Sequence, residues 1–324
     1  MATLTLAKAL NDGLRAAMER DPKVIIMGED VGKLGGVFRV TDGLQKDFGE
    51  QRVLDTPLAE SGIIGTAVGL AIRGFRPVCE IQFDGFVFPG YDQIVSQLAK
   101  LHFRSQGKVP VPVVVRIPFG GGIGAVEHHS ESPEALFAHV PGLKVVACSN
   151  AVDAYWMIQQ AIASDDPVIF FEPKRRYWEK AEVDLSVEPP PLYTSRVVKA
   201  GSTLTLAGYG SVLKTCLEAA TAAAEDGHDL EVIDLRTLSP LDLTPVVESV
   251  RRTGRLVVVA EAPGEVSVAA EVAAKVQEQC FHSLEAPVLR VTGFDTPYPP
   301  SKCEEEYLPD LDRVLDAVDR SLGW

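Results

Sequence analysis

In the stretch LDTPLAESGIIGTAVGLAIRG, residues 54–74, one acid, Glu60, stands immediately before a run of small and apolar residues with no charge before Arg73. This pattern predicts a helix that begins near Glu60. Its many glycines and alanines leave little side-chain bulk, so a neighbouring group can approach the helix backbone closely. Glu60 alone is ambiguous, because the helix dipole also favours an acid at a helix N-terminus.

On both sides of this helix, short β-branched runs alternate with helical patterns, which is typical of a mostly parallel α/β sheet. Charges and three consecutive prolines then interrupt the pattern and predict a linker at 181–198. A second series of runs follows it. We therefore expect an α/β fold with two domains, 1–180 and 199–324, each a mostly parallel sheet flanked by helices. The runs are KVIIMG (23–28), VPVVVRIP (111–118), LKVVAC (143–148), PVIFFEP (167–173), TLTLAGYG (203–210), LEVIDLRTLSP (230–240), RLVVVAEA (255–262) and PVLRVTGF (287–294).

Composition narrows the class of protein and its location. The formal net charge of −14 would repel a phosphate backbone and argues against nucleic acid as a partner. The five cysteines are scattered and form no C-x-x-C pair, which indicates a reducing compartment and no zinc site. No apolar run reaches about 18 residues without a charge or a breaker, so we expect no membrane span. The N-terminal residues resemble neither a signal nor a transit peptide, and a cytoplasmic location is the simplest expectation.

Two further segments contain residue types that bind ligands. EIQFDGFVFPGYDQI (80–94) is dense in aromatic residues around Gln82, and suits either a stacking wall for a heteroaromatic ring or a packed corner. PFGGGIGAVEHHSESPEALFAH (118–139) joins a glycine loop to His128 and His129. Adjacent histidines point in different directions, so we expect a proton-handling or anion-binding histidine, or ordinary surface residues, in preference to metal chelation. Ser132 is expected to cap the helix that follows.

Taken together, five motifs resemble the β subunit of thiamine-diphosphate-dependent 2-oxo acid dehydrogenases over essentially the whole chain. The resemblance implies a transketolase-like pyrimidine-binding domain followed by a transketolase C-terminal-like domain. It also favours a functional role for each motif over a purely structural one. The motifs are MGEDVG (27–32), DTPLAESGIIG (55–65), EIQFDGFVFPGYDQI (80–94), HHSESPEALFAHVPGLKVV (128–146) and RVTGFDTPYP (290–299).

The resemblance also implies a role for individual residues. Glu60 would hydrogen-bond the N1′ nitrogen of the aminopyrimidine and so promote formation of the carbon nucleophile on the cofactor. Gln82 and Phe86 would line the aminopyrimidine pocket, and His129 would face the reacting centre and assist substrate binding or acyl transfer. The chain departs from many relatives at two positions: Phe86 stands where they have tyrosine, and Glu131 where they have glutamine.

A missing motif points to a partner chain. Enzymes that bind thiamine diphosphate unaided carry a Gly-Asp-Gly motif for Mg²⁺, which needs hard oxygen ligands. The nearest stretch here is EDGHD (225–229), at a predicted helix end. The resemblance therefore implies that the Mg²⁺ ligands lie on an α subunit, in an α₂β₂ heterotetramer with the cofactor between the subunits. It also implies docking of the dihydrolipoyl acyltransferase core and its lipoyl domain, with Asp295 and the run Glu304–Glu306 as candidate contacts or as solvated surface.

Four functions remain open on the sequence. The leading hypothesis is decarboxylation of a branched-chain 2-oxo acid and reductive acylation of lipoamide, because residues 80–94 and 129–139 are closer to the branched-chain pattern. A pyruvate or acetoin dehydrogenase β subunit is the alternative within the class. A noncatalytic α/β scaffold that binds a partner protein, and a self-sufficient homodimeric synthase, are alternatives outside it. The length and the missing Mg²⁺ motif disfavour the synthase.

Overall fold

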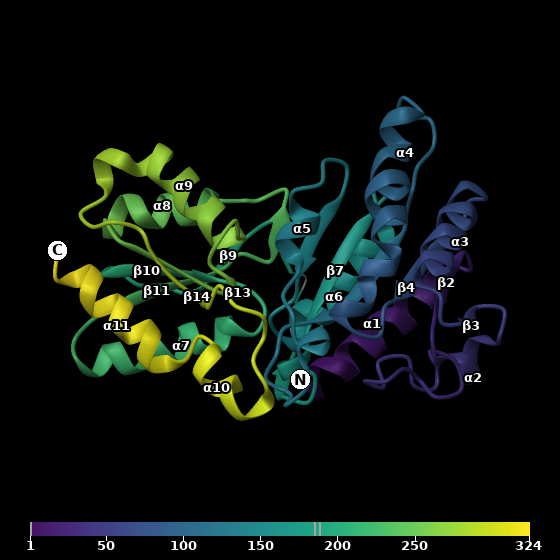
Figure 1. The fold of residues 1–324 in the computed structure, drawn as a ribbon, viewed down its shortest axis with the longest axis horizontal. Coiled ribbons are helices and arrows are strands. Elements are labelled where there is room, and N and C mark those ends of the chain that lie inside the picture. Colours follow the sequence, from purple (N-terminus) through teal and green to yellow (C-terminus); the bar gives the residue numbers. More distant parts are fainter. Residues whose placement is uncertain (1, 185, 188) are drawn as a thin grey trace.

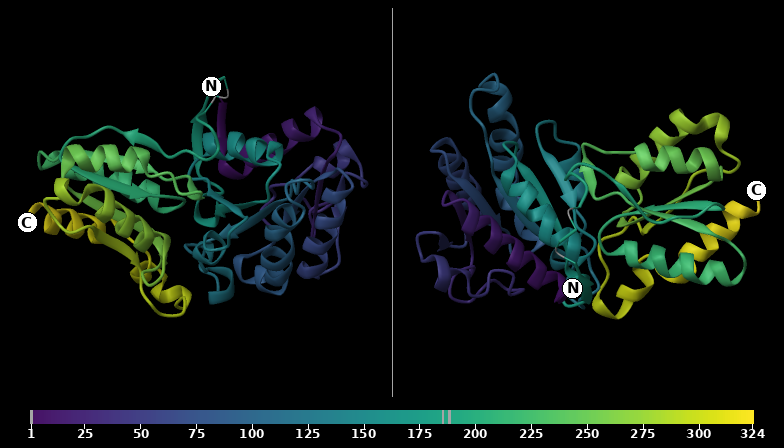
Figure 2. Two further views of the ribbon diagram at one scale, coloured as in Figure 1. Left: turned by 90° about the horizontal axis from the view of Figure 1, so that it is seen from above. Right: turned by 180° about the vertical axis from the view of Figure 1, so that it is seen from behind.

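The chain forms two α/β lobes that lie side by side along its longest axis (Figure 1). The computed structural model describes residues 2–184, 186–187 and 189–324. Each lobe is a mostly parallel sheet with helices on both faces, which confirms the expected fold class. Figure 2 shows the same two lobes from above and from behind, with the C-terminus at the outer end of the second lobe.

The first lobe is built on a seven-stranded sheet of order β12-β6-β7-β5-β4-β2-β3. All neighbouring pairs are parallel except β12 with β6. Central strands such as β5 are buried along their whole length, as expected of a parallel sheet covered on both faces. The strands are β2 (Val24–Gly28), β3 (Val53–Asp55), β4 (Arg76–Glu80), β5 (Val114–Phe119), β6 (Lys144–Ala147), β7 (Val168–Pro173) and β12 (Thr237–Ser239).

Helices cover both faces of this sheet. On one face, α1 packs against α6. Leu6, Leu10, Leu14 and Met18, which recur in the sequence with the spacing of one helix face, are buried there. On the other face, α3 and the helical segments after β4 pack against the sheet. The elements are α1 (Leu6–Arg20), α2 (Leu44–Phe48), α3 (Glu60–Ile72), the 3₁₀ helix η1 (Asp84–Gly90), the π-helix η2 (Gln93–Leu98), α4 (Ala99–Arg104), the 3₁₀ helix η3 (Glu127–His129), α5 (Glu134–Ala138), α6 (Ala151–Ala163) and the 3₁₀ helix η4 (Lys174–Arg176).

The second lobe is a five-stranded sheet of order β14-β13-β10-β11-β9, in which only the edge strand β9 is antiparallel. Helices α8 and α9 cover one face, and α7 and α11 the other (Figure 1). A separate two-stranded sheet pairs β1 (Ala2–Thr5) with β8 (Lys180–Val183). The elements are β9 (Arg196–Lys199), β10 (Leu204–Gly208), α7 (Val212–Glu225), β11 (Leu230–Asp234), α8 (Thr244–Thr253), β13 (Leu256–Pro263), α9 (Val268–Cys280), β14 (Leu289–Gly293), α10 (Glu304–Tyr307) and α11 (Leu311–Leu322), with 3₁₀ turns η5 (Phe281–Ser283) and η6 (Ser301–Cys303).

The stretch LEVIDLRTLSP, expected to be one strand, is two strands in two different sheets. β11 belongs to the second sheet, and β12 crosses to pair with β6 of the first. The turn between them passes through Arg236, whose φ of 53° is in the left-handed region and breaks the strand. The lobes also share one apolar core, in which Phe119 and Phe171 of the first lobe join Tyr209 and Ile233 of the second. The two lobes are therefore firmly joined.

The helix cap expected at Ser132 is also absent. α5 begins at Glu134, its cap position is Pro133, and no side chain caps it. Glu134 points instead to the second lobe, where its Oε1 accepts a hydrogen bond of 2.6 Å from the hydroxyl of Tyr209. Burial raises the pKa of Glu134 to about 7.

This raised pKa predicts how stability depends on pH. The folded chain retains a proton on Glu134 that the unfolded chain releases, so this stabilisation is complete below the ordinary pKa of 4.5 and is lost as pH rises through about 7. Between about pH 5 and pH 8 we expect Glu134 to lower the free energy of unfolding by about 2–3 kcal/mol. In denaturant unfolding of Glu134→Gln, the free energy of unfolding should not show this decrease with pH. The exposed control Glu50→Gln should show the same decrease as the unmodified chain. Equal pH profiles for Glu134→Gln and the unmodified chain would show that the carboxyl is ionised throughout.

Within the described residues, no helix combines the length and the apolar character that crossing a membrane requires.

Candidate functional site

Four neighbouring parallel strands place the candidate residues at one edge of the first sheet. In the order β5-β4-β2-β3, each strand ends at the same edge, because parallel strands share their direction. His129 follows β5, Gln82 follows β4, Glu29 follows β2 and Glu60 follows β3. Ligands of α/β sheets bind at the carboxyl ends of the strands, so this edge is the expected location of a site.

Glu60 is the first residue of α3 and is buried, with 6% of its surface exposed. The buried Glu29 is its electrostatic neighbour, and burial followed by repulsion from Glu60 raises the pKa of Glu29. In the described part of the chain, Glu29 Oε1 is buried and has no hydrogen-bond partner. Because an unpartnered buried oxygen costs free energy, the pair is suited to a ligand that brings its own polar atoms.

Gln82, the residue before Phe83, contacts the segment that follows β2. Its Nε2 donates long hydrogen bonds of 3.4 Å to the carbonyl oxygen of Glu29 and 3.3 Å to Oδ2 of Asp30. The side chain is half-buried, as a group that contacts a ligand at the sheet edge would be. These bonds orient the Gln82 amide relative to Glu29.

Phe86 and His129 meet in an aromatic cluster with Phe83. The rings of Phe83 and His129 are stacked, with centroids 4.0 Å apart and an interplanar angle of 14°. Phe86 meets His129 edge to face at 5.0 Å. The aromatic residues of this segment therefore pack on His129 and hold its imidazole in one orientation.

A backbone hydrogen bond fixes the tautomer of neutral His129. The distance from its Nδ1 to the carbonyl oxygen of His128 is 2.9 Å, and since a carbonyl only accepts, Nδ1 must be the donor. In the neutral ring Nε2 is then unprotonated and can accept a proton or a hydrogen bond. His128, in contrast, is exposed, and its Nδ1 lies 3.3 Å from the carboxylate of Glu127.

The loop that carries His129 is held against η1 by close backbone contact. A side chain at Gly85 would collide with the carbonyl oxygen of His128, so only glycine allows this approach. Beside it, Asp84 Oδ2 accepts a hydrogen bond of 2.6 Å from the backbone N–H of Glu131. The segment with Gln82 and Phe86 is thus joined directly to the segment with His129.

A buried ion pair lies beneath this junction. Lys174, in η4 directly after β7, is fully buried and donates from Nζ to Asp84 Oδ1. Burial raises the pKa of Asp84 to about 6 and lowers that of Lys174. The ammonium also lies 5.9 Å from the centroid of the Phe83 ring that stacks on His129.

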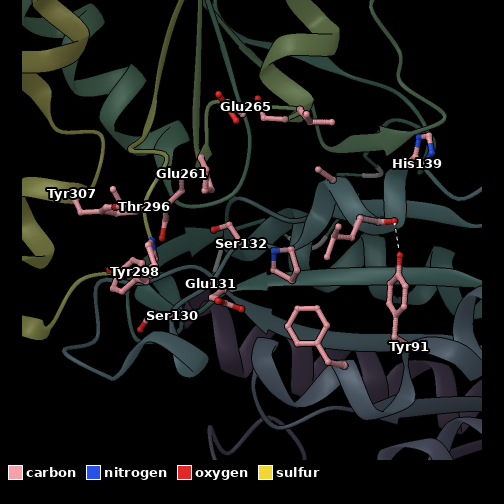
Figure 3. Close-up of a pocket in the computed structure, with 18 residues that line it drawn as sticks. Tyr91, Ser130, Glu131, Ser132, His139, Glu261, Glu265, Thr296, Tyr298 and Tyr307 are labelled. Atoms are coloured by element: carbon pink, nitrogen blue, oxygen red, sulfur yellow. Dashed lines mark hydrogen bonds between the residues drawn. The ribbon is translucent and has the colours of Figure 1, made fainter.

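A cavity of about 520 Å³ opens next to the loop, between the two lobes (Figure 3). Ser130 and Glu131 line it from the first lobe, and Glu261 and Tyr298 from the second. The carboxyl of Glu131, the residue that departs from the family pattern, is half-buried there, and burial raises its pKa. None of the four sequence-predicted site residues lines this cavity, so it is adjacent to the candidate site and separate from it.

Sequence reasoning named Glu60, Gln82, Phe86 and His129, and the structure places all four at one edge of the sheet. It missed Glu29, although the motif MGEDVG contains it, and a second acid at the end of a neighbouring strand was the available signal. No cluster of three or more metal-ligating side chains occurs within the ranges that the structure describes.

Comparison with known families gives the class of the protein. Residues 2–179 match the family described as "Transketolase, pyrimidine binding domain", and residues 194–314 match "Transketolase, C-terminal domain". A solved structure titled "Split gene transketolase, inactive beta4 tetramer" has the same fold, with a TM-score of 0.81 and 21% identity over 99% of this chain and 98% of that one. The two lobes are therefore transketolase domains.

Relatives of known name give the particular family. The "Pyruvate dehydrogenase E1 component subunit beta" of Leifsonia xyli subsp. xyli is 64% identical over 99% of this chain and 96% of the relative. The "3-methyl-2-oxobutanoate dehydrogenase subunit beta" of Mycobacterium tuberculosis is 53% identical over 99% of this chain and 92% of the relative. The chain belongs to the β subunits of the E1 component of 2-oxo acid dehydrogenases.

Proposed function

We propose that this β subunit, together with an α subunit, decarboxylates a branched-chain 2-oxo acid and transfers the acyl group to lipoamide on a dihydrolipoyl acyltransferase. The observation that carries the proposal is the convergence of Glu60, Gln82, Phe86 and His129 on the carboxyl ends of adjacent parallel strands. These residues supply an acid, an amide, an aromatic face and an imidazole at one sheet edge.

The residues at this edge fit the aminopyrimidine half of thiamine diphosphate. An aminopyrimidine carries ring nitrogens and an amino group that need hydrogen-bond partners, and an aromatic face that stacks. The unpartnered oxygen of Glu29, the buried acid Glu60 and the amide of Gln82 provide polar partners, and Phe86 provides an apolar face. Bound there, thiamine diphosphate would supply the carbon nucleophile that takes up the 2-oxo acid and stabilises the charge left by loss of CO₂.

Each side chain then has a distinct task. Glu60 would hold a proton at N1′ of the pyrimidine, and Gln82 would orient the ring edge. His129, fixed by the Phe83 stack and its Nδ1 hydrogen bond, would present Nε2 to the substrate or the lipoyl group. The apolar faces of Phe83 and Phe86 would exclude water from the reacting centre.

The proposed partner subunit follows from the missing Gly-Asp-Gly motif in this sequence. We propose that the α subunit supplies the Mg²⁺ ligands and binds the diphosphate, in an α₂β₂ heterotetramer with the cofactor between the subunits. The first domain, 1–180, would bind the pyrimidine. The second, 199–324 after the linker 181–198, would dock the acyltransferase.

Two observations bear on the substrate. The motif of residues 80–94 favours a branched-chain acid, and Phe86 in place of tyrosine makes the wall beside His129 more apolar, which suits an apolar acyl chain. Pyruvate is the second candidate, because the chain is more similar to the relative named for pyruvate dehydrogenase than to the one named for 3-methyl-2-oxobutanoate dehydrogenase.

A substrate panel with the reconstituted α/β pair decides between them. We expect kcat/KM for 3-methyl-2-oxobutanoate and 4-methyl-2-oxopentanoate to exceed that for pyruvate by about 10-fold or more, because each buried methylene group contributes about 1–3 kcal/mol of discrimination. The assay measures CO₂ released, with 2-oxobutyrate as an intermediate chain length. Equal rates with pyruvate and the branched acids would exclude the branched-chain assignment.

Calorimetry separates the wider alternatives. Magnesium-dependent binding of thiamine diphosphate by the α/β pair, and no binding by this chain alone, is the result we expect. A pair that binds no cofactor would support a noncatalytic scaffold. Cofactor uptake by this chain alone would support a self-sufficient homodimeric synthase.

A further inference from the structure

The sequence suggested that the acidic run Glu304–Glu306 contacts the acyltransferase or is solvated surface. One residue of the run, Glu304, does not lie on the surface. Glu305 and Glu306 are exposed, but Glu304 is buried, with 5% of its surface exposed. It begins the short helix α10 in the second lobe. Its carboxylate points into the first lobe, toward the segment 120–131, which we call the histidine loop.

Glu304 binds the histidine loop through backbone N–H groups. Oε1 accepts a hydrogen bond of 2.7 Å from Gly122, and Oε2 accepts one of 2.9 Å from Gly124. The hydroxyl of Tyr298 donates a third, 2.7 Å long, to Oε1. Hydrogen bonds from N–H groups to a carboxylate are about twice as strong as those between neutral groups, so this contact holds the loop firmly.

A second carboxylate from the same lobe binds the adjacent amide. Glu261, near the end of β13, is buried, and its Oε1 accepts from the backbone N–H of Gly121. Its other oxygen accepts from the hydroxyl of Ser211. Two acids of the second lobe therefore bind three backbone amides within the four residues 121–124 of the first lobe.

The glycines in the loop are required by this contact. A side chain at Gly121 would overlap the hydroxyl of Tyr298. Gly122 has a φ of 81°, in the left-handed region that favours glycine, and a side chain there would collide with Arg175. The loop backbone is thus shaped to fit the second lobe.

The other end of the histidine loop is fixed within the first lobe. Asp84 accepts from the backbone N–H of Glu131, and the carbonyl of Glu131 accepts from Gly120 at 2.8 Å. His129 lies between these two anchors. Figure 3 shows Ser130 and Glu131 lining the cavity together with Glu261 and Tyr298 of the second lobe.

We propose that Glu304, supported by Glu261, is a positioning residue for His129, so that the second domain sets the geometry of the imidazole in the first. The loop is attached at its start to the second lobe and at its end to Asp84. The imidazole between them is held by its contacts with the Phe83 and Phe86 rings and by the Nδ1 hydrogen bond to the carbonyl of His128, which belongs to the same loop. Loss of the Glu304 anchor would free two of the loop's early residues, Gly122 and Gly124, and let His129 leave its stack. The effect on catalysis rests on the role of His129 in the proposed function. The attachment of the loop to Glu304 rests only on the hydrogen bonds described above.

The test uses the reconstituted α/β pair with Glu304→Ala, Glu304→Gln, and the matched control Glu306→Ala from the same helix. Hydrogen exchange of peptides covering 120–131 should be about 10-fold faster or more in Glu304→Ala, intermediate in Glu304→Gln, which keeps one acceptor oxygen, and unchanged in Glu306→Ala. Unchanged exchange in Glu304→Ala would overturn the anchor, whether or not the pair is an active enzyme. If Glu304→Ala fails to fold, Tyr298→Phe, which removes one bond to the carboxylate, gives the same comparison.

Kinetics then test whether the anchor acts through His129. We expect Glu304→Ala to lower kcat/KM by about 10–100-fold, because small misplacements of a catalytic group have effects of that size. The Kd for thiamine diphosphate should stay within about 2-fold, because the hydrogen-bond partners of Glu304 are Gly122, Gly124 and Tyr298, and the proposed cofactor-binding residues are not among them. In a double-mutant cycle, Glu304→Ala should add little to the loss caused by His129→Ala. Additive losses would show that Glu304 does not act through His129. An inactive unmodified pair would refute the proposed function, and the hydrogen-exchange result would still test whether Glu304 anchors the loop.

Discussion

Replacing Glu60 by glutamine is expected to lower 2-oxo acid decarboxylation by the α/β pair by about 10²–10⁴-fold, the range of a lost acid–base group. Glutamine keeps the size of the side chain and its place at the start of α3, but its amide cannot exchange a proton with a pyrimidine nitrogen. The fold should be unaffected, because glutamine fills the same buried volume as Glu60. The measurement is CO₂ release from the preferred 2-oxo acid at saturating cofactor.

Two comparisons make the Glu60 result specific. The exposed Glu50→Gln should retain full activity, and calorimetry should show that Glu60→Gln still binds thiamine diphosphate, because stacking on Phe86 and the contacts of the α subunit remain. Glu29→Gln should give a smaller loss, since Glu29 is the neighbour of Glu60 and Gln82 in our scheme and does not hold the proton at N1′. Full activity of Glu60→Gln, or a larger loss in Glu29→Gln, would contradict the assignment of Glu60.

The sequence was sufficient for the architecture of each lobe, because buried parallel strands are continuous β-branched runs and the helices between them have a clear period. The apolar spacing of Leu6, Leu10 and Leu14 correctly predicts α1. It was insufficient where a local pattern has two structural outcomes. LEVIDLRTLSP mixes apolar and polar residues along its whole length, and nothing in this pattern reveals that the chain turns at Arg236 and gives its last residues to the other sheet.

The site shows the same division between local pattern and distant contact. Glu60 and His129 lie in motifs whose residue types and order are informative by themselves. Lys174 and Glu304 contact the site across about 90 and 180 residues of sequence, and such pairing is decided by tertiary packing alone. In the sequence, a buried lysine or glutamate cannot be distinguished from an exposed one. Burial was therefore the missing information.

The buried pair of Lys174 and Asp84 gives the second large effect, in this case on stability. Replacing Lys174 by methionine keeps much of the volume and removes the cation, which leaves Asp84 buried without an opposite charge. We expect the free energy of unfolding to fall by about 3–5 kcal/mol, the cost of breaking a buried ion pair by removing one partner. The exposed Lys108→Met is the matched control, and denaturant unfolding is the measurement.

The pH dependence and a double variant identify the cause of this loss. Burial already raises the pKa of Asp84 to about 6, and without the Lys174 charge, which lowers it, the pKa should rise further. Stabilisation by the protonated form is lost as pH rises through that value, so the penalty of Lys174→Met should be larger at about pH 8 than at about pH 5. Adding Asp84→Asn should recover most of the stability, because asparagine still accepts the hydrogen bond from Glu131 N–H and carries no charge. A penalty that is independent of pH and unchanged in the double variant would mean that Lys174 stabilises the fold by packing, and that its charge has no part in holding Phe83 and the histidine loop.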